Sequence, residues 1–217
     1  MYPAGNLLIP AEHGQLEAIL KEPRQGAPRG VALVLHPHPL GGGTMHNKVV
    51  FRAAAALNDA GLIVLRINFR GVGQSTGEHD EGRRERDDAR VGLDYLTQHY
   101  PGQRAFLCGF SFGARVGLEV GISDPRVAYL IGIGVPLEKY DFSFLASCRK
   151  PLLLVHGEHD EFGDVEHLRR VIAGLETNVP VRLVVIPGAG HFFDDQLDEL
   201  KRTITYWATD LLGMSTD

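Results

Sequence analysis

Residues 105–121 read Ala-Phe-Leu-Cys-Gly-Phe-Ser-Phe-Gly-Ala-Arg-Val-Gly-Leu-Glu-Val-Gly, and this stretch decides the fold. Its first four residues are a short apolar run, typical of a strand that is buried on both faces of a parallel sheet. Residues 109–113 form a G-x-S-x-G turn, and the small and apolar residues from Ala114 onward favour a closely packed helix. In such a sharp turn the serine, Ser111, stands clear of the sheet beside free N–H groups of the helix start. The stretch therefore predicts a nucleophilic serine next to an anion site.

A second G-x-S-x-G match covers residues 73–77 and contains Ser75. A polar interruption separates it from the apolar run that precedes it, and it leads into the charged residues 78–81 rather than into an apolar helix. Because the strand-turn-helix context is missing, we interpret Ser75 as a loop residue.

Strand and helix patterns alternate along the whole chain. We expect an α/β fold with one domain over residues 1–217, built on a doubly wound, mostly parallel sheet of about eight strands with helices on both faces. The short stretch between residues 111 and 160 leaves no room for a large lid. The expected strands are 6–10, 15–20, 31–35, 62–67, 105–108, 127–133, 152–156 and 181–186; the expected helices are 47–60, 86–100, 114 onward, 164–176 and a last one with the stripe Leu197, Leu200, Ile204, Trp207 and Leu211.

Composition limits the partners that the protein can have. The chain has 217 residues, is 44% hydrophobic and carries a net charge of −5, which argues against a surface that binds nucleic acid. Residues 1–6 lack a basic and apolar leader pattern, and no apolar run approaches membrane-spanning length. We therefore expect no targeting segment, no membrane partner and a cytoplasmic location. The two cysteines, Cys108 and Cys148, are expected to be free.

The loop after the strand 31–35 reads His-Pro-His-Pro-Leu-Gly-Gly-Gly over residues 36–43. Function collects at the carboxyl ends of the strands in such a sheet, and the glycines allow a ligand to approach the backbone closely. Acyl transfer needs two N–H donors for the oxyanion, and Phe112 supplies the first. Proline has no N–H, so the second donor is expected to be His38 or Leu40, with Gly41 less favoured.

The strands 152–156 and 181–186 are followed by loops that contain Asp160 and His191. A serine hydroxyl becomes a good nucleophile when an imidazole takes its proton and a carboxylate holds that imidazole. Asp160 and His191 are therefore the expected acid and base for Ser111. Glu161 and Asp164 remain alternatives for the acid.

Several motifs together carry a resemblance to a known family. They are His36-Pro37-His38-Pro39-Leu40-Gly41-Gly42, Phe69-Arg70-Gly71-Val72-Gly73-Gln74-Ser75, the Ser111 turn, the Asp160 loop and Gly190-His191. With these the chain resembles the α/β-hydrolase superfamily over nearly its whole length, most of all the small bacterial serine hydrolases of the dienelactone-hydrolase-like and prolyl-oligopeptidase-like branches. The resemblance implies the α/β-hydrolase fold and hydrolysis of carboxylic esters through an acyl-serine. Ser111 stands where the dienelactone hydrolases themselves have a cysteine.

The expected activity is thus hydrolysis of small to medium-sized esters, with a small-molecule ester as the partner and no metal or organic cofactor required. A serine peptidase, an acyltransferase and a non-catalytic binding protein on the same scaffold remain alternatives. Tyr140, Phe142 and Phe144 are expected at the rim of an open site. The oligomeric state is left open.

The remaining histidines and charges have simpler interpretations. A metal cluster of His36, His38 and His156 is a minor alternative. The charged run 78–90 is expected to be a solvated loop and helix face. Ordinary solvated side chains are expected for His13, His46, His79, His99 and His167.

Overall fold

The computed structural model describes residues 6–175 and 180–213, and it contains an eight-stranded sheet with the order β1-β2-β4-β3-β5-β6-β7-β8. β1 and β2 form an antiparallel hairpin, and β2 pairs with β4 in the antiparallel direction, whereas all pairs among β3 to β8 are parallel. The predicted mostly parallel sheet is therefore confirmed. The strands are β1 (Asn6–Ala11), β2 (Gly14–Lys21), β3 (Val31–Leu35), β4 (Ile63–Ile67), β5 (Ala105–Phe110), β6 (Val127–Ile133), β7 (Leu152–Gly157) and β8 (Val181–Ile186).

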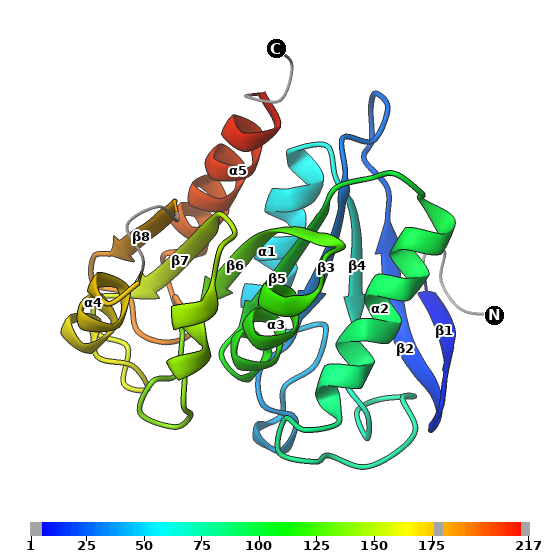
Figure 1. Ribbon diagram of the computed structural model, residues 1–217, viewed down its shortest axis with the longest axis horizontal. Coiled ribbons are helices and arrows are strands. Elements are labelled where there is room, and N and C mark those ends of the chain that lie inside the picture. The colour runs from blue at the N-terminus through cyan, green and yellow to red at the C-terminus, as the bar shows by residue number, and fades with distance from the viewer. Residues whose placement is uncertain (1–5, 176–179, 214–217) are drawn as a thin grey trace.

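Within the described residues, five α-helices cover the two faces of this sheet (Figure 1). α2 (Glu85–His99), α3 (Phe112–Ser123) and α4 (Val165–Ala173) pack on one face, and α1 (Lys48–Asp59) and α5 (Leu197–Gly213) pack on the other. Between β6 and β7 the structure has loops and one short 3-10 helix, η2 (Ser143–Ser147), so no large lid is inserted there. None of the helices in the described part of the chain combines the length and apolarity needed to span a lipid bilayer.

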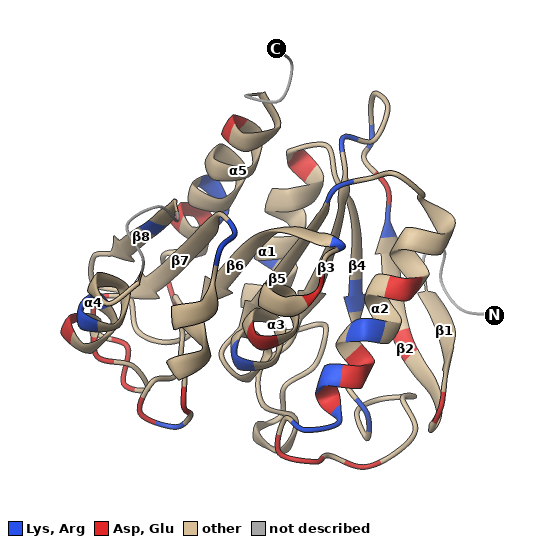
Figure 2. Ribbon diagram, viewed as in Figure 1, with Lys and Arg blue, Asp and Glu red and all other residues tan. Residues whose placement is uncertain are grey.

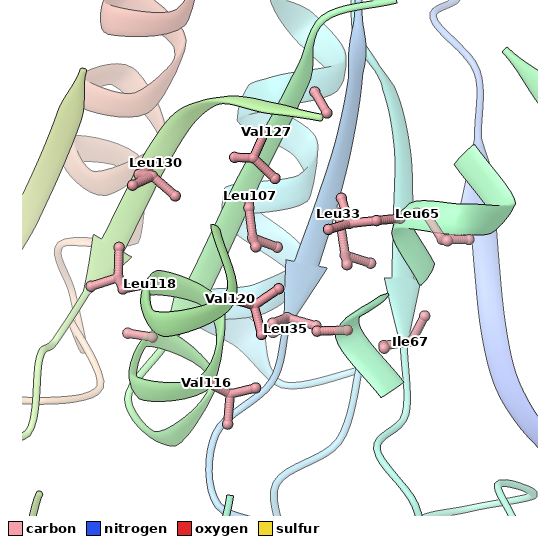
Figure 3. Packing of buried hydrophobic residues seen from close by; sticks show 14 of the residues in the cluster. Leu33, Leu35, Leu65, Ile67, Leu107, Val116, Leu118, Val120, Val127 and Leu130 are labelled. Carbon is pink, nitrogen blue, oxygen red and sulfur yellow. The ribbon is translucent and has the colours of Figure 1, made fainter. Parts of the chain in front are cut away.

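Alternate residues of each central strand enter the two cores. Leu33 and Leu35 of β3 pack with Leu107 of β5 and with Val116 and Val120 of α3 (Figure 3). The residues between them, such as Ala32 and Val34, face α1 and α5. Because the central strands are apolar on both faces, a hydrophobic core packs against each face of the sheet. The loops at its carboxyl edge are therefore anchored to rigid elements.

The helix ends show how local signals set the boundaries. The predicted helix 47–60 begins at Lys48 because the side chain of Asn47 accepts a hydrogen bond from the N–H of Val49 and caps it. Asp164 likewise caps α4 by accepting from the N–H of His167. α4 ends at Ala173, so the predicted helix is too long at residues 174–175, and its predicted end, Glu176, lies outside the described residues. In α5 the buried stripe includes Leu212, and Leu211 is only half-buried.

Charged residues gather on α2 and on the loops at the lower edge of the molecule in Figure 2. The prediction that the run 78–90 is wholly solvated is nevertheless wrong, because Glu85 and Asp88 are completely buried. Both carboxylates have partners: Glu85 accepts from the N–H groups of Asp80 and Gly82, and Asp88 accepts from Arg70. Buried carboxylates with hydrogen-bond partners of this kind hold the loop in one conformation and do not face the solvent.

Candidate active site

Ser111 lies in a strained turn between β5 and α3, with φ 56° and ψ −117°. Non-glycine residues rarely adopt this backbone conformation, and two flanking glycines make it sterically possible. A methyl group on Gly109 would lie 2.1 Å from the carbonyl oxygen of Gly113, and one on Gly113 would lie 2.5 Å from the carbonyl oxygen of His36. The G-x-S-x-G spacing therefore follows from close contacts between backbone segments.

Ser111, His191 and Asp160 form a continuous hydrogen-bonded chain. Nε2 of His191 lies 2.9 Å from Oγ of Ser111, and Nδ1 of His191 lies 2.9 Å from each carboxylate oxygen of Asp160. Asp160 follows β7 and His191 follows β8, so two neighbouring parallel strands bring them to the serine. The geometry lets Nδ1–H donate to the carboxylate while the Nε2 lone pair accepts the proton of the serine hydroxyl.

The imidazole of His191 is held by its surroundings as well as by hydrogen bonds. It is 2% exposed and packs against the rings of Phe110, Phe162 and Phe192 at centroid distances of 5.0, 4.6 and 5.2 Å. Oδ1 of Asp160 also accepts from the N–H of Phe162 at 2.9 Å. The ring orientation is therefore fixed before a substrate binds.

Two residues that line the same cavity as Ser111, Phe112 and His38, have N–H groups without an acceptor in their own segments. Phe112 is the first residue of α3, so its N–H has no acceptor within the helix. His38 precedes the short 3-10 helix η1 (Pro39–Gly41), and within the described residues its N–H meets no acceptor. Leu40, the other predicted donor, gives its N–H to Nδ1 of His38 at 3.2 Å, and Gly41 gives its N–H to the carbonyl oxygen of His38 at 3.1 Å. His38 is thus the better placed of the second donors.

A cavity of about 450 Å³ opens over Ser111. Its lining includes the aromatic residues Phe112, Tyr140, Phe162 and Phe192, together with polar side chains such as that of Lys139. The structure supports only part of the expected rim. Tyr140 lines the cavity, but Phe142 is buried at 4% exposure and Phe144 lies against the guanidinium of Arg115.

The rival serine and the rival acids have structural roles. The hydroxyl of Ser75 is buried, accepts from the N–H of Glu17 and donates to the carbonyl oxygen of Asn68. Asp164 caps α4, and Glu161 accepts from the backbone N–H of His191 at 3.3 Å without touching its ring. Neither acid takes the place that Asp160 occupies beside Nδ1.

The histidines His36 and His156 are buried against the backbone rather than gathered with His38. Nδ1 of His36 donates to the carbonyl oxygen of Pro37 at 2.6 Å, and its Nε2 accepts from the N–H of Phe69 at 3.0 Å. Burial lowers the pKa of His36 to about 4, so the ring is neutral near pH 7. His156 lies 2.6 Å from the carbonyl oxygen of Gly163. The structure therefore does not assemble the alternative metal cluster of His36, His38 and His156.

His79 is not an ordinary solvated histidine, and that prediction is wrong. Its side chain is 8% exposed and packs against the rings of His38 and Phe112. His38, His79 and Glu81 bring ligand atoms within 4.8 Å of one another beside the cavity. The sequence carried no signal for this contact, because the polar loop 70–84 has no periodicity that would indicate which side chains turn inward.

Comparisons with known proteins agree with this fold. Residues 30–207 match the family model described as an alpha/beta hydrolase domain. An uncharacterised protein of Rickettsia prowazekii is 41% identical over 181 residues, which cover 80% of this chain and 76% of that protein. The structure of an alpha-beta serine hydrolase homologue from Coxiella burnetii has a TM-score of 0.88 and 36% identity, and covers 95% of this chain and 98% of its own. A Xanthomonas campestris protein, described as a serine hydrolase without a lid, has a TM-score of 0.88 and 32% identity over 97% of each chain.

Proposed function

Since this chain belongs to the alpha/beta hydrolase family, we propose that it cleaves carboxylic esters of small to medium size through an acyl-serine intermediate. The observation that carries the proposal is the chain of 2.9 Å contacts from Ser111 through His191 to Asp160 at the base of an aromatic cavity. Each group needed for acyl transfer has a residue in a suitable position.

The first half of the reaction forms the acyl-enzyme. Nε2 of His191 removes the hydroxyl proton of Ser111 as Oγ attacks the ester carbonyl, and Asp160 stabilises the resulting imidazolium. The N–H groups of Phe112 and His38 donate to the oxyanion of the tetrahedral intermediate. His191 then gives its proton to the leaving alcohol as the carbon–oxygen bond breaks.

The second half releases the acid. A water molecule enters the place of the alcohol, His191 takes one of its protons, and the hydroxide attacks the acyl carbonyl. Collapse of the second tetrahedral intermediate returns the proton to Oγ of Ser111 and frees the carboxylic acid. All proton transfers use side chains of the protein, so the scheme needs no metal or organic cofactor.

The cavity supports a preference for modest substrates. Its volume of about 450 Å³ is at the lower end of the usual range for small-molecule sites, roughly 300–1,000 Å³. The aromatic wall favours an apolar acyl group. We also retain the predictions that the partner is a small-molecule ester, rather than a nucleic acid or a membrane, and that the protein is cytoplasmic.

Labelling with a fluorophosphonate probe and mapping the modified peptide tests this proposal, with turnover of short p-nitrophenyl esters measured in parallel. We expect modification at Ser111, and loss of labelling and turnover in Ser111→Ala. Ser75→Ala is the matched control from the second G-x-S-x-G sequence, and its labelling should persist. A folded protein without labelling or turnover would instead favour a non-catalytic binding protein, and labelling with turnover of amides alone would favour a peptidase.

A further inference from the structure

A group of three side chains beside the cavity has no role in the reaction described above. They are His38 from the loop after β3, and His79 and Glu81 from the loop between β4 and α2, which run along the same edge of the molecule (Figure 1). The rings of His38 and His79 lie 4.8 Å apart between centroids, and Nε2 of His79 lies 3.7 Å from Oε1 of Glu81. We propose that His38, His79 and Glu81 bind a Zn²⁺ ion and that this binding slows the hydrolase.

The environment of His79 is the first support for a metal. Its side chain is 8% exposed, and within residues 6–175 and 180–213 its Nε2 has no hydrogen-bond partner. A buried imidazole nitrogen without such a partner is uncommon, and this Nε2 lies 3.7 Å from Oε1 of Glu81. A cation at this point would satisfy the lone pair.

Glu85 provides the second support, because it completes an arrangement typical of metal-binding histidines. Oε1 of Glu85 lies 2.8 Å from Nδ1 of His79, and this carboxylate is held in place by the N–H groups of Asp80 and Gly82. A carboxylate beside one ring nitrogen keeps the proton on that nitrogen and leaves the other nitrogen free to ligate. The buried Glu85 therefore prepares Nε2 of His79 as a ligand.

The ligand types favour zinc over the hard cations. Two imidazoles and one carboxylate, with a fourth position open to water, match the zinc sites of many proteins, whereas Mg²⁺ and Ca²⁺ prefer oxygen ligands alone. Tetrahedral Zn²⁺ places its ligand atoms about 3.4 Å apart. The ligand atoms here lie within 4.8 Å of one another, so the site has to close slightly. Glu81, whose side chain is 66% exposed, has the freedom to do so.

Binding at His38 would reach the catalytic machinery through Leu40. Nδ1 of His38 accepts the N–H of Leu40 and caps η1, and a neutral imidazole has only one nitrogen with a free lone pair. If Nε2 of His38 ligates the metal, Nδ1 must carry the ring proton and can no longer accept the N–H of Leu40. If Nδ1 ligates the metal instead, the lone pair that accepted this N–H is used in the bond to zinc. The bond to Leu40 is lost in either case. That bond fixes the loop whose His38 N–H we propose as an oxyanion donor, so bound zinc should slow turnover.

Zinc binding can be measured without any activity. Ser111→Ala protein without a histidine tag is titrated with Zn²⁺ by isothermal calorimetry, and one ion per chain should bind at micromolar or lower concentration. Glu81→Gln in the same background should bind at least about tenfold more weakly, because it removes a ligand. The exposed Glu78 lies outside the cluster, so Glu78→Gln should bind normally. Absence of zinc uptake, or uptake that Glu81→Gln leaves unchanged, would overturn the site.

The coupling to activity rests on the proposed function and needs its own measurement. Zn²⁺ should shift the amide NMR signal of Leu40 and lower ester turnover of the wild type, while Glu81→Gln, which lies outside the cavity and the triad, should keep its turnover in the same zinc. Bound zinc with an unmoved Leu40 signal and unchanged turnover would overturn the coupling. If Ser111→Ala binds zinc but the wild type hydrolyses no ester even without metal, the proposed function fails and the metal site stands.

Discussion

Arg70 and Asp88 form an ion pair sealed inside the protein: Nη2 of Arg70 lies 2.7 Å from Oδ1 of Asp88, and the two side chains are 6% and 0% exposed. The backbone N–H of Arg70 also donates to Oδ2 of Asp88 at 2.9 Å. Burial raises the pKa of the Asp88 carboxyl, and the hydrogen bonds from Arg70 oppose that rise. The pair ties the start of the loop after β4 to the first turns of α2, so the loop that carries His79 is closed at both ends.

Removing one partner of this pair should destabilise the protein strongly. Asp88→Ala leaves the guanidinium of Arg70 buried without its counter-charge, which should lower the free energy of unfolding by about 3–5 kcal/mol. Urea denaturation of the wild type and the variant at pH 7.5 measures this decrease in the free energy of unfolding. The neighbouring Asp87 pairs with Arg90 at the surface, so Asp87→Ala should change the free energy by less than about 1 kcal/mol. Equal effects of the two substitutions would contradict the assigned role.

Gly113 should not tolerate a methyl group. The added carbon would lie 2.5 Å from the backbone carbonyl oxygens of Leu35, the last residue of β3, and of His36, which follows it. We expect Gly113→Ala to lower the free energy of unfolding by about 2 kcal/mol or more and to reduce ester turnover. Thermal unfolding followed by circular dichroism measures the first effect. Gly174→Ala is the control, because an added methyl would meet only atoms at 3.5 Å or beyond.

Stability should fall as the solution is acidified, in part because of His36. The ring is buried and neutral, with a pKa of about 4 against an ordinary value of 6.5. Between these two values the unfolded chain binds a proton that the folded protein refuses, so the free energy of unfolding decreases as the pH falls from 6.5 to 4 and changes little from this source outside that window. The full effect is about 3 kcal/mol.

Comparing wild type with His36→Gln isolates this contribution. Urea denaturation at pH 7.5 and pH 5 should show a smaller loss of stability on acidification for the variant, because its amide does not titrate. His46→Gln, which changes an exposed histidine, should keep the wild-type loss. An unchanged pH dependence in His36→Gln would show that another group causes it.

Kinetic measurements can show which carboxylate, that of Asp160 or that of Glu161, is the acid of the proposed triad. Asp160→Asn should lower kcat by about 10³–10⁴-fold and change KM little, because the amide cannot hold the same imidazole tautomer or stabilise the imidazolium. Glu161→Gln should retain activity within roughly tenfold, since Glu161 contacts only the backbone of His191. Rates with a p-nitrophenyl ester decide between the two carboxylates. A larger loss in Glu161→Gln would transfer the role to Glu161.

Much of the fold was predictable from sequence because its signals are local. Residues 105–121 combine an apolar strand, a turn that only flanking glycines permit and a helix of small residues, and the structure has β5, the strained Ser111 and α3 in those places. The parallel sheet then places the loops after β7 and β8 side by side, which is why the sequence alone predicts that Asp160 and His191 act together.

What sequence could not predict is which polar and aromatic side chains turn inward. Glu85 and Asp88 belong to a run of charged residues that is typical of a solvent-exposed segment. The burial of Asp88 depends on its bonds from Arg70, and the burial of Glu85 depends on N–H groups of the loop that precedes α2. His79 is buried for the same reason. Phe142 is expected at the rim of the site, but its side chain packs in the hydrophobic core with Leu145 of η2. Such outcomes depend on three-dimensional partners that no local pattern encodes.

The order of the segments along the chain has a consequence for biosynthesis. The strained serine and the loop after β3 belong to the first 113 residues, whereas the imidazole that would activate the serine follows β8, at position 191. A ribosome makes Ser111 well before His191, and the two side chains come together only after β8 has paired with β7 at the edge of the sheet. If the proposed function holds, a nascent chain that has folded only through β6 should therefore be inert toward esters until β7, β8 and residue 191 have been added.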